Sequence, residues 1–352
     1  MSQSISVGIV GATGAVGQEL LGILAERNFP VGELRLLASP QSAGKSVVFR
    51  GEPFVIQATT EDSVSGLDVV FFSAGASRSR EFAPAVLHSG GLVIDNSSAF
   101  RMDPEIPLVV PEINGELLQD GPRLVANPNC TAIMLLMAVA PLRRLGPISR
   151  LIVSTYQSIS GAGAAAMEEL LDQTRAVLAG EPAVPQILPH PCAFNVFSHN
   201  TPIGEDGLNE EESKVIAESR KILGEPNLAI QVTCVRVPVL RAHTETVVIE
   251  FAGSAPSLES VRTALRDAPG VQLVDDRATN TFPMPIEASG KDDVLVGRVR
   301  IDPSHPSAIS LMVSGDQLRK GAALNAVQIA EVLALDPDRA SGLSAASVGP
   351  KS

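Results

Sequence analysis

The stretch Gly8-Ile-Val-Gly11-Ala-Thr-Gly14-Ala-Val-Gly17 decides the fold of the amino-terminal part of the chain. It follows an apolar run from Ser4 to Val10 that is typical of a buried strand, and it precedes a helical pattern from Gln18 to Arg27. Glycines at a strand-to-helix turn let the backbone approach a pyrophosphate, to which the helix N-terminus offers free N–H groups. The spacing is not the common Gly-x-Gly-x-x-Gly, so a turn that serves packing alone remains an alternative.

Further strands and a helix follow this turn in the order of an alternating α/β fold. Short apolar runs predict strands at Leu34–Ala38, Val69–Phe72 and Leu92–Ile94, and a helical pattern covers Arg80–His88. Strands that alternate with helices form a parallel sheet through right-handed crossovers. The sequence therefore predicts an α/β protein whose residues 1–128 form a Rossmann-type dinucleotide-binding domain.

The pattern changes after Asn127-Pro128-Asn129, and residues 129–318 are predicted to form a second domain. Several of its segments alternate in hydrophobicity, as half-exposed strands of an antiparallel sheet do. The predicted strands are Arg150–Gln157, Ala229–Val235, Thr244–Phe251, Val294–Arg300 and Ala308–Ser314, and the predicted helices are Thr131–Leu142, Ala164–Leu178, Glu210–Leu223 and Leu258–Arg266. We expect an α+β domain with a mixed or mainly antiparallel sheet, a helix over 319–335 that returns to the first domain, and a mobile tail over 336–352.

The composition describes an acidic chain with an aliphatic core. Of 352 residues, 45% are hydrophobic, one is Tyr and none is Trp, and the formal net charge is −12. This charge argues against nucleic acid or an anionic membrane as a partner, and no segment predicts a transmembrane helix. The start Met-Ser-Gln-Ser-Ile-Ser-Val lacks the features of a signal peptide, so we expect a cytoplasmic protein.

The three cysteines, Cys130, Cys192 and Cys234, match neither a disulfide framework nor a zinc site, and no metal is expected. Cys130 begins a predicted helix, whose N-terminal dipole favours a thiolate, although a core cysteine fits the same position. Cys192 and Cys234 have settings typical of small buried side chains. His243, at the edge of a predicted strand, is the candidate base, because imidazole exchanges protons near neutral pH. The remaining histidines are interpreted as structural or solvated: His88, His190, His199 and His305.

The loop after the second predicted strand, Leu37 to Lys45, bears on the choice of cofactor. NAD enzymes usually place an acidic residue there to bind the ribose 2′-hydroxyl, and this loop contains none. It offers Ser39, Ser42 and Lys45 instead, which favour a 2′-phosphate. The sequence therefore predicts NADP as the cofactor.

Six motifs, in order, resemble the aspartate-β-semialdehyde dehydrogenase family from residue 5 to about 335. They are Gly11-Ala-Thr-Gly-Ala-Val-Gly17, Asp95-Asn-Ser-Ser-Ala-Phe-Arg101, Asn127-Pro-Asn-Cys130-Thr131, Ser154-Thr-Tyr-Gln157 with Ser160-Gly-Ala-Gly163, Arg236 to His243, and Arg319-Lys-Gly-Ala-Ala-Leu-Asn325-Ala. The resemblance implies reversible, NADPH-dependent conversion of L-4-aspartyl phosphate to L-aspartate 4-semialdehyde and phosphate, in the biosynthesis of lysine, threonine and methionine. It also implies a homodimer formed by the second domain, and leaves a tetramer open.

The same resemblance implies a role for each matching residue. Cys130 would form a thioester, His243 would be the acid/base residue, and Gln157 would orient the acyl intermediate. Arg236 would grip the substrate α-carboxylate, and Glu211 would hold its α-ammonium. The residues that resemble the phosphate-binding set are Arg101, Asn129 and Lys214. The implied cofactor residues are Gly11, Thr13, Gly14, Ala15, Val16, Ser39, Ser42, Lys45, Ser160, Gly161 and Asn325. Family members often carry Arg at the position of Gln41, so the serines and the lysine of the loop are left to bind the 2′-phosphate.

Several of these residues also have a purely structural interpretation, and two other functions are alternatives for the whole protein. Without the resemblance, Glu211 reads as part of a solvated helix start, Arg101 as a loop cap and Lys214 as ambiguous, and we interpret Arg241 as a surface charge. N-acetyl-γ-glutamyl-phosphate reductase uses similar chemistry, but its motif usually reads Asn-Pro-Gly-Cys-Tyr, whereas Asn129 precedes the cysteine here. A catalytically silent binding protein is the alternative outside enzymes, and phosphate-dependent NADP reduction with aspartate semialdehyde would distinguish it.

Overall fold

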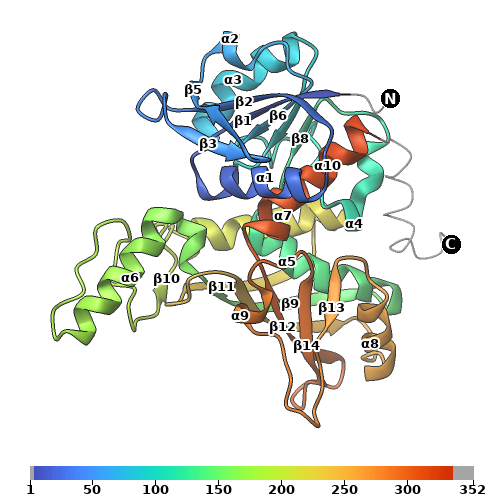
Figure 1. Cartoon of the computed structure of the whole chain (residues 1–352). Coiled ribbons are helices and arrows are strands. Elements are labelled where there is room, and N and C mark those ends of the chain that lie inside the picture. The colour runs from blue at the N-terminus through green and yellow to red at the C-terminus, as the bar shows by residue number, and fades with distance from the viewer. Residues whose placement is uncertain (1–3, 336–352) are drawn as a thin grey trace. The chain divides into compact units, whose positions relative to one another are not determined.

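The computed structural model describes residues 4–335, which fall into two compact units (Figure 1). Unit 1 comprises residues 4–129 and 322–335, and unit 2 comprises residues 130–321. The chain therefore passes between the units twice, after Asn129 and after Gly321. The tail that was predicted to be mobile, residues 336–352, lies outside the described residues.

Unit 1 is built on a six-stranded parallel sheet in the order β5-β2-β1-β6-β7-β8. The strands are β1 (Ile5–Val10), β2 (Val31–Ala38), β5 (Gln57–Ala58), β6 (Val69–Phe72), β7 (Leu92–Asp95) and β8 (Leu124–Ala126). This is the strand order of the doubly wound dinucleotide-binding fold. A separate antiparallel hairpin consists of β3 (Ser46–Phe49) and β4 (Glu52–Val55).

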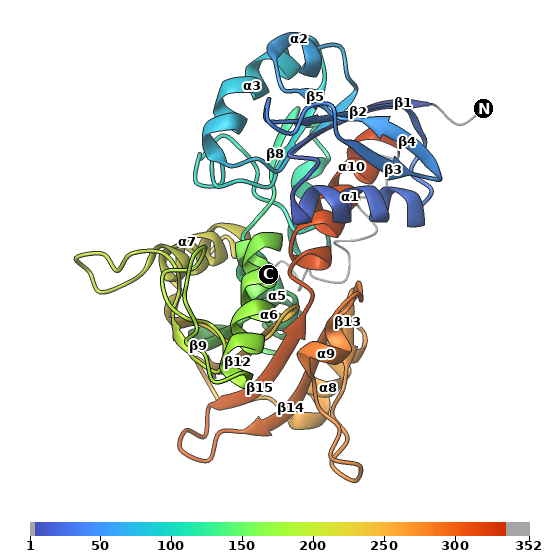
Figure 2. The ribbon, with the colours of Figure 1, turned by 60° about the vertical axis from the view of Figure 1, so that its left-hand side comes forward.

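Helices cover both faces of this sheet (Figures 1 and 2). One core contains α1 (Ala15–Glu26) and α10 (Leu324–Ala334), and the other contains α2 (Glu61–Val64) and α3 (Ala76–His88). Strand β6 serves both cores, because Val69 and Phe71 point into the first and Val70 and Phe72 into the second. A strand buried on both faces reads as a continuous apolar run, which is why its sequence does not alternate. The short helix α4 (Pro111–Asn114) precedes β8.

Unit 2 contains a mixed sheet of seven strands in the order β10-β11-β9-β12-β15-β14-β13. Its strands are β9 (Ile148–Gln157), β10 (Phe197–Ser198), β11 (Ala229–Arg236), β12 (His243–Phe251), β13 (Val271–Leu273), β14 (Val294–Ile301) and β15 (Ala308–Gly315). The pairs β11–β9 and β13–β14 are parallel, and the other neighbouring pairs are antiparallel.

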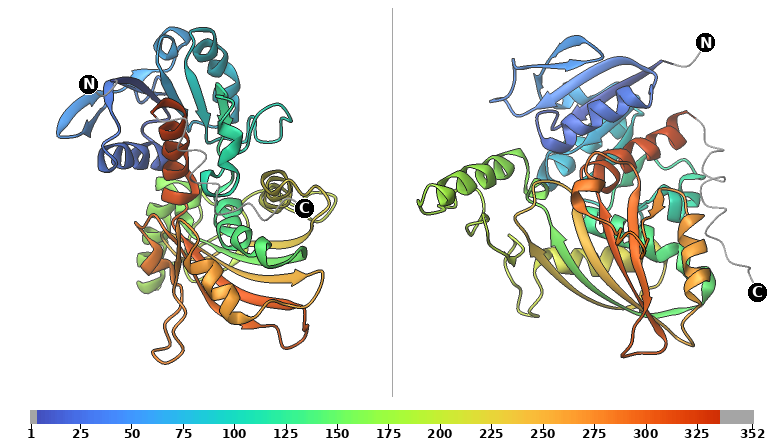
Figure 3. Two further views of the ribbon diagram at one scale, coloured as in Figure 1. Left: turned by 90° about the vertical axis from the view of Figure 1, so that its right-hand side faces the viewer. Right: turned by 60° about the horizontal axis from the view of Figure 1, so that its bottom comes forward.

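One face of the unit 2 sheet packs against helices. These are α5 (Cys130–Val139), α7 (Glu210–Leu223) and α8 (Leu258–Arg266). Along β9, Leu151, Val153, Thr155 and Gln157 are buried, while the intervening side chains, from Ile152 to Tyr156, are half-buried or exposed. Helix α6 (Ala164–Leu178) packs against the segment that leads to β10, as Figure 3 shows, and α9 (Pro285–Ala288) follows β13.

The predicted fold class is confirmed, because unit 1 is a parallel Rossmann-type sheet with helices on both faces and unit 2 is an α+β unit with a mixed sheet. The predicted helix over 319–335 needs a correction. Residues Arg319–Ala323 form a wide, π-helical turn, and the α-helix begins only at Leu324. The chain passes from unit 2 to unit 1 within this turn, and the last residue of the turn, Ala323, already packs in the core of unit 1.

Candidate active site

The glycine turn of unit 1 borders a cavity of about 400 Å³ at the carboxyl ends of β1 and β2. Gly11, Thr13 and Gly14 line one side, and Ser39 and Arg78 are among the other lining residues. Doubly wound proteins bind nucleotides at this edge of the sheet, where the order of the strands reverses. The cavity is therefore the candidate cofactor site.

Gly11 shows why the turn needs glycine. Its φ is +94°, and a Cβ built there would lie 2.5 Å from the backbone oxygen of Ser73. Either feature excludes a larger residue without a local shift of the backbone. The turn thereby brings the start of α1, at Ala15 and Val16, close behind the cavity-lining glycines.

The structure places the other predicted cofactor residues in different surroundings. Ser39 lines the cavity, whereas Ser42 and Lys45 belong to the turn after β2 and are absent from the cavity lining in the described part of the chain. Asn325 is buried on α10, where its amide Nδ2 donates to Val109 O and to Asn127 Oδ1, at 2.9 and 2.7 Å. Its side chain therefore fixes the segment just before Cys130.

Cys130 is the first residue of α5, in unit 2, and its thiol is partly exposed. The nine residues that follow it in the helix are all buried, which holds the helix N-terminus in place. The turn Arg319–Ala323 passes directly beside it, because a Cβ on Gly321 would lie 2.8 Å from the Cβ of Cys130. Only glycine permits this approach.

His243 begins β12, is buried, and has its Nε2 atom 3.8 Å from the Sγ of Cys130. The backbone N–H of Ser158 donates to its Nδ1 at 3.0 Å, and the Ser158 hydroxyl lies at the same distance. Since Nδ1 accepts this bond, we assign the proton of the neutral ring to Nε2, facing the sulfur. Burial, and secondarily Arg236, lowers the pKa of His243 to about 3, so the ring stays neutral at physiological pH.

Gln157 ends β9 and is the centre of a buried polar cluster. Its Nε2 donates to Thr131 Oγ1 and to Glu211 Oε1, both at 2.9 Å. Thr155 Oγ1 donates to its Oε1 at 3.3 Å. Strand β9, helix α5 and helix α7 each contribute to this cluster, so Glu211 is not a solvated residue of the helix start.

Arg236 ends β11 and is 1% exposed, which makes its guanidinium one of the most buried cations of the chain. Its Nη1 donates to Ser158 O at 2.7 Å. Its Nη2 contacts His199 Nε2 and Asn200 Oδ1, both at 2.7 Å, and its Nε donates to the same Oδ1 at 3.3 Å. The pairing of β10 with β11 brings these two residues to the arginine.

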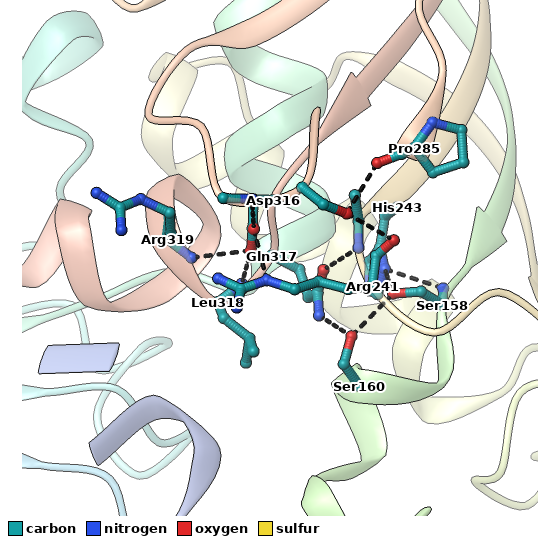
Figure 4. A network of polar contacts seen from close by, with 12 residues as sticks. Ser158, Ser160, Arg241, His243, Pro285, Asp316, Gln317, Leu318 and Arg319 are labelled. Atoms are coloured by element: carbon teal, nitrogen blue, oxygen red, sulfur yellow. Dashed lines mark hydrogen bonds and ion pairs between the residues drawn. The ribbon is translucent and has the colours of Figure 1, made fainter. Parts of the chain in front are cut away.

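Two predicted cofactor residues, Ser160 and Gly161, lie in unit 2 beside this cluster. A Cβ on Gly161 would approach Arg236 Nη1 to 3.1 Å and His243 Cε1 to 3.2 Å. Ser160 bonds through its hydroxyl to Gln317, as Figure 4 shows. Gln317 Oε1 in turn accepts from the backbone N–H of Ala242, one residue before His243.

Asp316 anchors the other side of this network (Figure 4). It is buried and accepts from Arg241 Nε at 2.6 Å and from the backbone N–H groups of Gly290, Leu318 and Arg319. Our interpretation of Arg241 as a surface charge was therefore wrong. Its guanidinium is held by a fully buried carboxylate, which the alternation of Arg236 and Arg241 with apolar residues does not reveal.

The remaining predicted substrate residues divide between the units. In unit 1, Arg101 is buried and donates to the backbone oxygens of Asn127 and Asn96, at 2.9 and 2.7 Å, and Asn129 is buried at the end of the unit. In unit 2, Lys214 Nζ pairs with Glu210 on the same helix at 2.6 Å. The interpretation of Arg101 as a loop cap thus fits its contacts as well as a ligand role does.

Sequence reasoning missed several residues of this site. Ser158, Gln317 and Asn200 were not singled out, and His199 was interpreted as structural or solvated. Burial lowers the pKa of His199 to about 4, so it too is neutral beside Arg236. No local pattern indicates these contacts, because each depends on the pairing of strands that are distant in the sequence.

Residues 4–335 contain neither a candidate membrane span nor a candidate metal site. No helix in this range is long and apolar enough to cross a bilayer. No group of three or more His, Cys, Asp or Glu side chains in the same range is arranged to hold a metal ion.

The fold and the cluster together define a dinucleotide-binding oxidoreductase with a cysteine and a histidine side by side. Residues 6–121 match the family model "Semialdehyde dehydrogenase, NAD binding domain", and residues 139–320 match "Semialdehyde dehydrogenase, dimerisation domain". The chain belongs to the aspartate-semialdehyde dehydrogenase family. The resemblance predicted from the motifs is confirmed.

Individual relatives match over nearly their whole length. Aspartate-semialdehyde dehydrogenase of Synechocystis sp. is 55% identical over 95% of this chain and 98% of that protein. The Bacillus subtilis protein of the same name is 43% identical over 95% and 98%. A crystal structure of aspartate semialdehyde dehydrogenase II from Vibrio cholerae, complexed with ASA, is 44% identical with a TM-score of 0.90, over 94% of this chain and 98% of that one.

Proposed function

We propose that this protein is an NADP-dependent aspartate-semialdehyde dehydrogenase that works through a thioester on Cys130. The names of the relatives and the ASA in the Vibrio cholerae structure support the substrate. The single observation that carries the mechanism is the 3.8 Å approach of His243 Nε2 to Cys130 Sγ at the start of a helix. The reaction is the reversible conversion of L-4-aspartyl phosphate to L-aspartate 4-semialdehyde and phosphate, which serves the synthesis of lysine, threonine and methionine.

Cys130 attacks as a thiolate. The N-terminus of α5 and the Nε2–H of His243 both favour negative charge on the sulfur. Attack on the acyl phosphate carbon forms the carbon–sulfur bond, and the carbon–oxygen bond to phosphate breaks as phosphate leaves. When bound, NADPH supplies the hydride that reduces this thioester to the aldehyde and returns the thiolate.

His243 acts in this scheme as a neutral hydrogen-bond donor. Its Nε2–H faces the Cys130 sulfur, so it lies near the carbon that this sulfur attacks and can stabilise the oxyanion that develops there. A preorganised donor of this kind lowers a barrier by about 3–4 kcal/mol where one has been removed. The ring can act as a base only after it loses the bond from Ser158 to Nδ1.

The buried cluster next to the sulfur recognises the amino-acid part of the substrate. Arg236 binds the α-carboxylate and Glu211 binds the α-ammonium, while Gln157 fixes Glu211 through the bond at 2.9 Å. Arg101, Asn129 and Lys214 bind the phosphate, as the family motifs imply. An unacetylated substrate suits this cluster, because a buried carboxylate needs a cationic partner.

The cavity of unit 1 holds the cofactor. Gly11, Thr13 and Gly14, at the start of α1, would hold the pyrophosphate through backbone N–H groups, and Ser39 would bind the ribose. Arg78, which pairs with Glu81 at 2.6 Å, lines the same cavity and offers the cation that Gln41 does not provide. These residues favour NADP over NAD.

The assembly is a homodimer that forms through the open face of the unit 2 sheet, and the alternative assembly is a tetramer of two such dimers. The dimerisation-domain model matches the unit that carries this face. The compartment is the cytoplasm, where a nucleophilic thiol stays reduced. No nucleic acid or membrane takes part.

The test is NADP reduction by the purified protein with L-aspartate 4-semialdehyde, measured with and without phosphate. We expect phosphate-dependent turnover in the wild type and none in Cys130→Ala, with NADP affinity unchanged in the variant because the cofactor cavity lies in unit 1. The matched control is Cys234→Ala, whose thiol is buried in β11 and has a pKa raised by burial. Turnover of Cys130→Ala near the wild-type rate would remove the covalent mechanism.

A further inference from the structure

All three nitrogens of the Arg236 guanidinium have hydrogen-bond partners, and all of these partners are neutral. An arginine side chain has five N–H donors. Four contacts are present, to Ser158 O, to His199 Nε2 and, from two nitrogens, to Asn200 Oδ1. Arg236 forms no ion pair with any carboxylate of residues 4–335, although Glu211 is near enough to oppose the effect of burial on the arginine pKa. A buried guanidinium without a paired anion is costly, so this site favours a carboxylate.

Asn200 occupies the edge of Arg236 that suits a carboxylate. Its Oδ1 lies 3.3 Å from Nε and 2.7 Å from Nη2, so one oxygen bridges the two nitrogens that form the fork. A carboxylate uses the same pair of donors with two oxygens. The opposite edge is closed, because Nη1 donates to Ser158 O and Nη2 also contacts His199.

Asn200 is held less firmly in its position than Ser158 and Arg236 are. It is exposed and follows the two-residue strand β10, and the only side-chain contacts of Asn200 within residues 4–335 are those with Arg236. Ser158 contributes a backbone oxygen next to β9, and Arg236 is itself buried in β11. A neutral amide oxygen is also a weaker acceptor for a guanidinium than a carboxylate.

We propose that Asn200 is a displaceable stand-in for the substrate carboxylate: it occupies the Nε/Nη2 edge of Arg236 in the free enzyme and leaves when the carboxylate binds there. The inference rests on the proposed role of Arg236. Asn200 thereby keeps the buried cation hydrogen-bonded between turnovers, and the exchange sets part of the substrate KM. His199 is a positioning residue in this arrangement, because its neutral Nε2 holds Nη2 while the fork changes partners.

The first test is Asn200→Asp, which places a carboxylate of the protein itself on the fork. We expect the KM for L-aspartate 4-semialdehyde to rise at least about tenfold, because a charged acceptor competes far better than an amide. We expect kcat at saturating substrate and NADP affinity to stay within about twofold of wild type, since the substrate can still displace the loop. A KM within twofold of wild type would overturn the proposal.

The second test is Asn200→Ala, for which a stand-in and a structural support predict opposite signs. Removal of the competing acceptor should lower the KM by roughly threefold or more, since the substrate then no longer displaces a hydrogen bond to a charged group. A KM that is unchanged or raised would show that Asn200 supports the arginine instead. Asn280→Asp, the same change on an exposed loop outside the arginine cluster, is the matched control and should leave KM unchanged.

Arg236→Leu separates this inference from the proposed function. If the wild type turns over the semialdehyde and Arg236→Leu raises KM, the proposed role of Arg236 is supported. The two Asn200 variants then test only whether Asn200 is displaced by the substrate carboxylate. If Arg236→Leu leaves KM unchanged, the assignment of Arg236 fails, and the stand-in fails with it. Direct binding of L-aspartate, measured by calorimetry on the Cys130→Ala protein, gives the same comparison without turnover.

Discussion

The Ser158 backbone N–H decides which ring nitrogen of His243 carries the proton, and a single substitution can remove this donor. Ser158 has φ −66°, which proline adopts without strain, and it follows a strand residue, which proline also tolerates. In Ser158→Pro, the proton of His243 is free to move to Nδ1, so the fraction of rings with Nε2–H falls. We expect kcat to fall about 10- to 100-fold, in line with the loss of one catalytic donor.

The same variant has a signature that a merely structural defect lacks. The Ser158 N–H opposes a second proton on the ring, so the pKa of His243 should rise from about 3 in Ser158→Pro. NMR titration of ring-labelled histidine measures this rise. Ser158→Ala keeps the backbone donor and is the control, with kcat and pKa expected near those of the wild type. Equal kcat values for the proline and alanine variants would contradict the assigned tautomer.

Glu245 predicts a pH dependence of stability. Its carboxyl is buried on β12, neither oxygen has a hydrogen-bond partner within residues 4–335, and burial, with Glu211 nearby, raises its pKa well above the usual value. The folded state therefore holds a proton that the unfolded state has released above about pH 4.3. The free energy of unfolding therefore falls as the pH rises from about 4.3 toward the folded-state pKa of Glu245. The fall is about 1.4 kcal/mol per pH unit.

Glu245→Gln removes this titration, because an amide does not ionise. We expect its free energy of unfolding to exceed that of the wild type by a margin that grows between pH 5 and pH 8, as urea denaturation at each pH would measure. The ionisable groups that interact with Glu245 from other elements, Glu211 and Cys234, are common to both proteins, so their own titration contributes to both curves. A constant margin over this range would show that Glu245 is ionised in the folded protein.

At the scale of the element, the turn Arg319–Ala323 has a shape that depends on one glycine. A Cβ on Gly321 would lie 2.8 Å from the Cβ of Cys130, closer than atoms can pack. Gly321→Ala must move the first turn of α5 or the π-helical turn, and overpacking of this kind costs about 1–3 kcal/mol. We expect a loss of kcat of roughly tenfold or more, measured with the semialdehyde at saturation.

Gly22→Ala is the matched control for this prediction. Gly22 lies inside α1 with open space around its Cα, so alanine there should stabilise the helix by up to about 1 kcal/mol and leave kcat unchanged. If Gly321→Ala is as active as Gly22→Ala, the close approach to Cys130 is not needed for turnover.

At the scale of the whole molecule, the open face of the unit 2 sheet accounts for the proposed dimer. Tyr156 is 42% exposed there and follows the half-buried Ile152 and Ser154 on β9, although the same strand ends in the buried polar cluster at Gln157. A charge buried in such a face costs binding energy, so Tyr156→Asp should raise the dimer dissociation constant at least about tenfold. Light scattering after gel filtration measures this, and Val48→Asp, on the exposed hairpin of unit 1, is the control that should leave the dimer intact.

Much of this molecule was predictable from local sequence. The glycine turn needs glycine for its positive φ, and the runs Val69–Phe72 and Ala164–Leu178 match their elements to the residue. Cys130 stands directly before a long apolar stretch, and that alone predicts a thiol at the start of a helix. These features are determined by interactions between residues a few positions apart, so the sequence alone is enough to predict them.

The tertiary structure alone decided which polar groups meet. The Nε2–H of His243 faces Cys130 because β12 pairs with β9 and brings Ser158 to Nδ1, and Asn200 reaches Arg236 because β10 pairs with β11. Arg241 and Asp316 form their ion pair 75 residues apart, and nothing near either residue indicates it. Burial also exists only in the packed chain, and it sets the protonation of His243 and Glu245. Strand order and burial are long-range properties, so a local pattern cannot contain them.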